Sequence, residues 1–513
     1  MIVDVIAVFI ATIIYLSVVL AVGVFCFRKV HTLNEFCIGA RARCSAELGL
    51  SGQLSELGFF IFVTIPAGIY LYGLGKAWVM AGLFIGTMFI WYLMSFRMMR
   101  YSLKYQNVYT LPDYFERRFG KGDALPLSAA VINILFDLIM SSALIVFLSE
   151  IVSDIFEIKP IITSVSCVVV VMLLICLSGF VGAVKIDRIN AIVVLAALLA
   201  MPVVTLFIFE ADDLIVSIMN SRVVGGVSRY LDLFRVNGKS IKPLEIVNQL
   251  SWGFVIMGLP GLMVRFLAIG KARTAKHGGR YAILFTLLAL FFTVVCGVLY
   301  RAFLYPMILK GGNDHLIIAK TVKKLTEMKL GYKIAGGLIF VGFLASIISM
   351  LISEIHNACA VIYCSIIRPR VMKKKKIRKN LMALRITLVV VSLIVFALTT
   401  VDIDPVIIIE TALICVGSAF GPCTMLSLYY RRMNKYGATT GMLSGVIVAL
   451  LWRFLEVFKA SGEITDLEDM TGVSPILPAF VISTLLILVV SRLTPDVSEA
   501  IKKDHDDVKN RIL

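Results

Sequence analysis

Long apolar runs separated by short polar segments make up most of the chain. A membrane-spanning helix needs about 20 mostly apolar residues. Thirteen segments along the 513 residues meet this condition, namely 5–27, 45–73, 77–97, 125–152, 160–180, 187–209, 246–268, 281–309, 333–364, 382–400, 405–428, 438–457 and 474–492. The pattern predicts an all-α integral membrane protein with about 13 transmembrane helices, organised as a single domain over residues 1–513.

Composition supports lipid as the solvent of this chain. Apolar residues make up 59% and charged residues 16%, whereas soluble domains are nearer half apolar and a quarter charged. The net charge of +17 comes from 50 Lys and Arg against 33 Asp and Glu. These basic residues lie in short loops between the apolar runs, where they follow the positive-inside rule. We therefore expect the lipid bilayer as a partner and no nucleic acid.

The basic residues also predict the orientation. Residues 5–27 are uncharged and Arg28 and Lys29 follow them, so the run indicates a spanning helix with its N-terminus outside rather than a signal peptide. The basic run 373–379 predicts a cytoplasmic loop, and 311–315 then faces outside. Thirteen crossings place the C-terminus in the cytoplasm, and the expected location is the plasma (inner) membrane.

Residues that break helices occur inside two apolar runs. The second span contains Gly52, Gly58 and Pro66, and the seventh contains Gly258 and Pro260. Unwound backbone at membrane depth is tolerated only where it lines a protein cavity, and paired broken helices are typical of carriers built from inverted repeats. The alternative is that these glycines serve close packing and the prolines produce a kink.

Ionisable groups also lie within or near the spans: Glu56, Asp137, Glu354 with His356 close by, and Glu410. An ionised group at this depth costs at least about 2.5–3.5 kcal/mol, so such groups usually face a cavity or a partner. Glu56 is the most informative because it lies among the helix-breaking residues of span two. A neutral acid or a packed ion pair is the alternative interpretation for each.

Hydroxyl groups recur on the ninth span. Ser346, Ser349 and Ser353 are three and four residues apart, which places them on one helical face. They can ligate an alkali cation or bond to the carbonyl one turn back. The chain contains no HExxH motif, no paired zinc ligands and no Ser-His-Asp set placed by a motif, so we expect neither an enzyme nor a bound cofactor. A repeated filter sequence, as channels carry, is also missing.

Five stretches resemble the sodium/solute symporter family, and most closely its proline-transporting branch. They are Thr110–Phe119 (TLPDYFERRF), Gly179–Val184 (GFVGAV) with Asp187 after it, Trp252–Phe266, Ser418–Pro422 (SAFGP), and Arg432 through Trp452. Each stretch is short, but their shared order and spacing make the resemblance specific over most of the chain.

The resemblance implies the leucine-transporter-like arrangement of two inverted five-helix repeats. These would be residues 45–209 and 246–428, with broken helices in spans two and seven. The extra helices would be 5–27, 438–457 and 474–492. Such a protein works by alternating access around a site at the middle of the membrane.

The resemblance also implies a cation site. Its positions are the backbone carbonyls of Leu54, Leu57 and Ser346 and the side chains of Ser349 and Met350. The family has Ser or Thr where this chain has Met350, and a thioether is a poor ligand for sodium, which prefers hard oxygen atoms. Asp187 stands where the family has an Asp needed for coupling, and Glu56 stands where the proline carriers have Asp. Sodium is the expected coupling ion, and a proton carried by Glu56 is the alternative.

The expected solute site departs from that of the proline carriers, which use two Tyr, a Trp and a Pro. Here the four positions are Ile139, Ile256, Trp252 and Pro260, so both phenol groups are missing. Glu56 is the expected polar contact. We expect a small organic solute, an amino acid such as proline or a related metabolite. The alternative is a transporter-like sensor or degenerate paralogue that binds without transporting.

Overall fold

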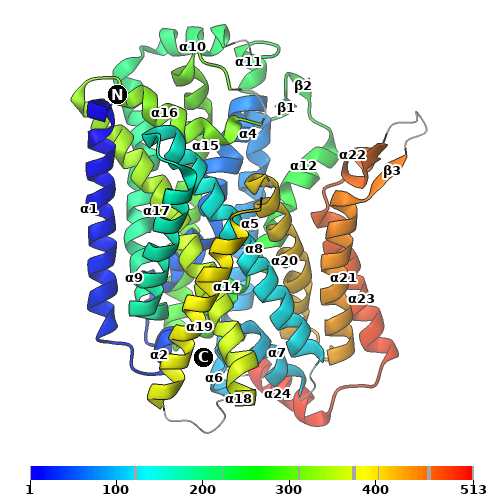
Figure 1. Cartoon of the computed structure of the whole chain (residues 1–513). Helices are drawn as coiled ribbons and strands as arrows, with labels where there is room; N and C mark the ends of the chain where they lie inside the picture. The colour runs from blue at the N-terminus through cyan, green and yellow to red at the C-terminus, as the bar shows by residue number, and fades with distance from the viewer. Residues whose placement is uncertain are drawn as a thin grey trace.

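The computed structural model describes residues 2–120, 124–221, 223–309, 312–371, 377–401, 404–458 and 464–510. It is a bundle of long helices with two small two-stranded hairpins at one end (Figure 1). The predicted all-helical class is confirmed. Large apolar side chains remain exposed along the outer helices, as for Leu206, which is 80% exposed, and Phe207, which is 77% exposed. Lipid covers such surfaces in a multi-pass membrane protein.

The first half of the chain forms the following elements. They are α1 (Ile2–Phe27), α2 (Leu33–Ile38), α3 (Ser45–Phe59), α4 (Ile65–Tyr72), α5 (Trp78–Phe89), α6 (Ser95–Tyr105), α7 (Leu111–Phe119), α8 (Ala124–Phe156), α9 (Pro160–Ile208), α10 (Ala211–Asn220), α11 (Val227–Tyr230), β1 (Arg235–Val236) and β2 (Lys239–Ser240). π-Helical turns join α3 to α4 (Phe60–Thr64) and α5 to α6 (Ile90–Met94).

The second half continues the bundle. Its elements are α12 (Pro243–Leu250), α13 (Trp252–Ile256), α14 (Pro260–Leu267), α15 (Ala272–Leu304), α16 (Ile317–Thr326), α17 (Leu330–Val361), α18 (Arg368–Val371), α19 (Ile377–Leu398), α20 (Pro405–Tyr429), α21 (Lys435–Phe454), β3 (Glu456–Phe458), β4 (Ile464–Asp466), α22 (Leu467–Thr471), α23 (Ile476–Leu493) and α24 (Glu499–Asn510). Both hairpins are antiparallel.

Eleven helices in the described ranges are long and apolar enough to cross a membrane, and a bent pair brings the number to twelve. The longest, α9, has 49 residues, about 73 Å at 1.5 Å per residue, against a hydrocarbon core of about 30 Å. Its backbone turns at Gly179, where φ is 49° and an added Cβ would lie 2.8 Å from the Phe36 ring. This break lies at the end of the predicted span 160–180 and precedes the predicted span 187–209. Thirteen crossings remain a prediction.

Of the two predicted helix breaks, the structure contains the one in span seven and not the one in span two. In span seven, α13 ends at Ile256, Leu259 is extended, and Pro260 starts α14 at an angle of 43°. The prediction of a broken span seven is therefore confirmed. Gly258 lies in the break and touches α20, since an added Cβ would come within 2.6 Å of the Gly417 carbonyl oxygen.

Span two is not unwound, in contrast to the prediction. The dihedral angles at both ends of its π-helical turn are helical, and Ser45–Tyr72 form one continuous span. Its glycines serve close packing instead. An added Cβ at Gly49 would lie 2.3 Å from the Gly278 carbonyl oxygen, and one at Gly58 would lie 3.1 Å from the Met350 sulfur. The packing interpretation of these glycines is the correct one here.

The two ends of the bundle differ in character. The start of α1 lies at the end that carries α10, α11 and α12, and α7, α18 and α24 lie at the opposite end (Figure 1). There α24 docks on α6 through Lys104, which is 2.6 Å from Asp504 and 2.8 Å from Asp507. Residues 373–376 of the basic run predicted to be cytoplasmic lie outside the described residues, as do residues 310 and 311 at the predicted outer loop.

Candidate functional site

A vestibule of about 550 Å³ penetrates the bundle from the end that carries α12. Residues from α4, α5, α12, α13 and α20 line it, together with residues near α22. Trp252 lies at its inner end, where the indole ring packs edge-on against Phe60 at 5.1 Å between ring centroids. At its rim, Lys76 pairs with Glu245 at 3.3 Å and joins the end of α4 to the start of α12.

A second, much smaller cavity of about 20 Å³ lies deeper in the bundle. Its lining is Phe136, Asp137, Met140, Leu259, Pro260, Glu354, Ala412, Leu413 and Val416. The predicted solute positions are thus divided. Trp252 lines the vestibule and Pro260 lines the small cavity, whereas Ile139 and Ile256 line neither. Ile256 is buried.

Arg265 on α14 occupies the centre of a buried polar cluster, with only 3% of its surface exposed. Its Nε donates to Ser51 Oγ at 3.1 Å and its Nη1 donates to Ser353 Oγ at 2.9 Å. Its Nη2 forms an ion pair with Asp187 Oδ2 at 3.4 Å, and Ser51 Oγ donates to the same oxygen at 2.6 Å. The guanidinium therefore ties α14 to α3, α9 and α17.

The cluster extends from Asp187 toward α1. Asn190, one turn after Asp187 on α9, donates to Ser349 Oγ at 2.8 Å and to the Ala345 carbonyl at 3.1 Å. Tyr15 OH donates to the Asn190 side-chain oxygen at 3.1 Å. Ser349 also lies within hydrogen-bonding reach of Asp187. The predicted coupling residue and a predicted cation ligand are therefore neighbours in the structure.

The five predicted cation ligands lie on the facing surfaces of α3 and α17. Leu54, Leu57, Ser346, Ser349 and Met350 are all buried. The backbone of α3 remains helical here, and the Leu57 carbonyl accepts from the Phe60 N–H. The Ser346 hydroxyl donates to the Phe343 carbonyl at 2.7 Å. The structure brings these positions together, and their role as ligands stays a proposal.

Three more buried carboxyl groups lie in this region, of which Glu56 and Glu354 are close to Arg265 and Asp137 is close to Glu354. Asp137 accepts from Asn133 at 2.6 Å and from Asn357 at 2.9 Å, and its carboxyl is within hydrogen-bonding reach of Glu354. Glu56 faces the break in span seven, since an added Cβ at Gly261 would come within 2.4 Å of its Oε1.

The two other charged candidates have different positions. His356 stacks on Phe36, and its Nε2 is 3.0 Å from the Phe36 carbonyl oxygen, so it serves packing. Glu410 lines the vestibule.

The sequence analysis did not identify Arg265, Ser51 or Asn190 as site residues. Arg265 stands inside the Trp252–Phe266 stretch that carries the resemblance, and Asn190 is three residues after Asp187, on the same helical face. The sequence therefore contained a signal for each of these two residues. Arg265 is a charge inside a matched motif, and Asn190 has helical spacing from the predicted coupling residue Asp187.

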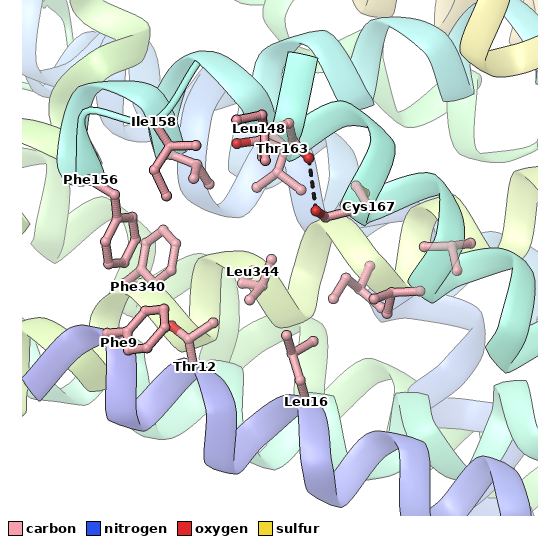
Figure 2. A pocket seen from close by; sticks show the side chains of 16 residues that line it. Phe9, Thr12, Leu16, Leu148, Phe156, Ile158, Thr163, Cys167, Phe340 and Leu344 are labelled. Atoms are coloured by element: carbon pink, nitrogen blue, oxygen red, sulfur yellow. Dashed lines mark hydrogen bonds between the residues drawn. The ribbon is translucent and has the colours of Figure 1, made fainter. Parts of the chain in front are cut away.

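An apolar pocket of about 230 Å³ lies elsewhere, between α1, α8, α9 and α17 (Figure 2). Phe9, Leu16, Phe156, Phe340 and Leu344 face it. The Thr12 hydroxyl beside them is engaged with the Val8 carbonyl at 2.8 Å. This lining suits hydrocarbon rather than a polar solute, so the pocket is not the candidate solute site.

A multi-pass helical bundle with a vestibule, a broken span and a buried charged centre belongs to the class of membrane solute carriers. The sequence pattern of the sodium:solute symporter family matches residues 36–445, and the chain belongs to this family.

Two similar proteins are proline carriers by name. The chain is 25% identical over 499 residues to the osmoregulated proline transporter OpuE of Bacillus subtilis, covering 94% of each chain. It is 26% identical over 488 residues to the sodium/proline symporter of Haemophilus influenzae, covering 94% of this chain and 93% of that one.

Among solved structures, a Na⁺-coupled sialic acid symporter in a substrate-bound outward-open state superposes with a TM-score of 0.74. The identity is 14%, and the match covers 96% of this chain and 99% of that one. This likeness confirms the fold, which is that of the leucine-transporter-like carriers.

Proposed function

We propose that this chain is a secondary active transporter that couples the uptake of a small organic solute to sodium by alternating access. One observation carries the proposal. In a member of this family, the vestibule ends at Trp252 and a buried polar cluster around Arg265 lies beyond it. The broken span seven connects the two. A carrier needs this arrangement, because the central binding sites must be accessible from only one side of the membrane at a time.

The proposed solute is an amino acid such as proline or a related metabolite. The names of the two relatives support this class. Ile139 and Ile256 replace the phenol groups of the proline carriers, so the contacts to the solute differ from theirs. Trp252 and Glu56 are the proposed aromatic and polar contacts, with Pro260 at the break.

The proposed sodium site consists of the Leu54, Leu57 and Ser346 carbonyls with Ser349 and Met350. The burial of all five residues on the facing helices α3 and α17 supports it. Asp187 beside Ser349 supplies the negative charge that favours a cation. The thioether of Met350 supplies a weak ligand, so we expect sodium to bind less tightly than at a site with a fifth hard oxygen.

Proton coupling is the second candidate, and the carboxyl groups near Arg265 favour it. Glu56 and Glu354 lie near one guanidinium that is already paired with Asp187, and Asp137 lies beside Glu354. Uncompensated charges at membrane depth are costly. A proton bound at Glu56 would remove one of them, and sodium would then be unnecessary for coupling.

We place the protein in the plasma (inner) membrane with its N-terminus outside and its C-terminus in the cytoplasm, as the distribution of Lys and Arg predicts. The proposed partners are the solute, sodium or protons, and the bilayer. Neither catalysis nor nucleic-acid binding forms part of the proposal.

Purified protein in liposomes with imposed sodium or pH gradients tests both candidates. Under sodium coupling, uptake follows the sodium gradient, and Met350→Thr lowers the sodium concentration for half-maximal uptake. Under proton coupling, uptake follows the pH gradient, ignores sodium and is lost in Glu56→Gln. Solute binding without uptake under either gradient would identify a transporter-like sensor and refute the proposal.

A further inference from the structure

Two polar side chains lie one helical turn outward from the aromatic pair at the inner end of the vestibule. Gln249 on α12 precedes Trp252 by three residues, and Thr64 follows Phe60 by four. Gln249, Thr64 and Trp252 line the vestibule. Phe60 lies behind Trp252, and the two rings are in contact. The π-helical turn of span two and helix α12 of span seven therefore each present one polar group beside the same aromatic surface.

The carboxamide of Gln249 is buried and unsatisfied. The residue is 5% exposed, and neither its Nε2 nor its Oε1 has a hydrogen-bond partner among the described residues. Its neighbour Asn248 is different, because it bonds to Gly472 and Ser474 and fixes the loop after α22. A buried amide without partners costs free energy that a bound ligand with the right groups recovers.

The Thr64 hydroxyl is also without a partner in the described part of the chain. Threonines in helices commonly donate to the carbonyl four residues back, as Thr12, Thr205 and Thr411 do, although Thr293 and Thr321 do not. Thr64 ends the π-helical turn Phe60–Thr64. Unlike Thr293 and Thr321, Thr64 lines the vestibule, so its hydroxyl is available to a ligand there.

The charges of the vestibule favour a solute without net negative charge. Its lysine and its arginine are both paired, Lys76 with Glu245 at 3.3 Å and Arg453 with Glu468 at 2.8 Å. Asp404 and Glu410 add two more carboxyl groups to the lining. His315 also lines the vestibule. The described carboxyl groups of its lining, Glu245, Glu468, Asp404 and Glu410, outnumber its lysine and arginine, which disfavours an anion.

We infer that Gln249 and Thr64, with Trp252, form the recognition site for the polar end of the solute, which is a zwitterion or a carboxamide. The Gln249 Nε2 donates to the solute's carboxylate or carbonyl oxygen, and Gln249 Oε1 or Thr64 Oγ1 accepts from its amine or amide N–H. The apolar part of the solute contacts the face of Trp252. This inference rests on the proposed transport function. The proposed polar contacts to the solute therefore lie further toward the opening of the vestibule than Ile139 and Ile256, which occupy the positions of the phenol groups in the proline carriers.

The test is uptake of tritiated L-proline by the full-length protein in liposomes, repeated with the other common amino acids, under the gradient that drives uptake. Gln249→Leu and Thr64→Val remove the polar groups with little change of volume. Thr411→Val is the matched control, because its hydroxyl bonds only to its own helix at Ile407. We expect the KM to rise about tenfold in Gln249→Leu, as loss of a hydrogen bond to a charged group predicts, with a smaller rise in Thr64→Val. The kcat of both and the KM of Thr411→Val should stay within about twofold.

Each other result has a defined meaning. An unchanged KM in Gln249→Leu overturns the inference while leaving transport intact. Gradient-driven uptake restricted to solutes that lack an adjacent donor and acceptor also overturns the inference alone. If the wild-type protein transports no amino acid, binding of L-proline and the other amino acids is measured by thermal shift. Binding that weakens in Gln249→Leu then supports the inference without transport, and absence of binding overturns it.

Discussion

The ion pair of Arg265 and Asp187 links α14 to α9 where span seven is broken, and neutralising one partner should strongly destabilise the protein. At 3.4 Å two unit charges attract by about 5 kcal/mol at an effective dielectric constant of about 20. Both side chains are buried, with exposed fractions of 3% and 0%. Removing one member of such a pair leaves a charge without compensation, at a cost of about 3–5 kcal/mol.

A double-mutant cycle with Arg265→Gln, Asp187→Asn and the double variant measures this coupling. Unfolding of the purified protein in mixed micelles gives the free energy for each variant. We expect each single change to lower the free energy of unfolding by about 3 kcal/mol or more, and the double change to cost less than the sum of the two by at least about 1.5 kcal/mol. Uptake should fall sharply in both single variants, because the same two groups border the proposed sodium site.

The pair of Arg453 and Glu468 at the vestibule provides the control. Its N–O distance is shorter, 2.8 Å, but its side chains are 22% and 32% exposed. Solvent screening limits such pairs to about 0–1 kcal/mol. Additive effects of Arg265→Gln and Asp187→Asn, or a coupling no larger than at this control pair, would refute the reasoning.

Two further predictions concern the solute site and the C-terminal helix. Trp252→Ala should raise the KM for the solute about fivefold, the equivalent of about 1 kcal/mol of lost aromatic contact, with unchanged melting temperature. An unchanged KM would place the site elsewhere. Burial of the ring, and to a smaller extent the nearby positive charge of Arg118, lowers the pKa of His505 on α24 below its ordinary value of 6.5. The docked helix therefore favours the neutral ring, so docking is stable above about pH 6.5 and weakens as pH falls below it. A spin label at exposed Lys503 should gain mobility at pH 5.5 in the wild type and not in His505→Leu; equal mobility in both at all pH values would contradict this.

The fold was largely predictable because hydrophobic periodicity and length are local properties. The apolar runs correctly indicated a multi-pass helical bundle, and the pattern Gly258–Pro260 correctly indicated the break in span seven, since proline starts a new helix and removes a backbone donor. Glycine and proline in span two led to the prediction of a break that the structure does not have. A glycine serves equally as a break and as a contact point, and only the neighbours Gly278 and Met350 reveal that Gly49 and Gly58 are contact points.

The site was less predictable because its contacts join residues far apart in the chain. Arg265 bonds to Ser51 across 214 positions and to Asp187 across 78. Asp187 was identified through the resemblance, but its cationic partner was not. Gln249 offered no sequence signal, since a glutamine in an amphipathic helix normally faces solvent. Its significance comes from being buried at the vestibule without a partner, which only the three-dimensional structure shows.

The charges at the centre of the protein explain why it must be sealed from the vestibule. In the described part of the chain, Asp187, Glu56 and Glu354 lie near the guanidinium of Arg265, and Asp137 lies beside Glu354. If all were ionised, three negative charges would remain, at about 2.5–3.5 kcal/mol or more for each at membrane depth. Positive charge must therefore accompany the polypeptide through every closed state, as sodium, as protons or on the solute. A zwitterion brings no net charge. With such a solute, the coupling ions alone therefore supply the compensating positive charge. Phe60, which is buried against Trp252 at the inner end of the vestibule, then belongs to the barrier that must keep those ions in the centre while the vestibule is open.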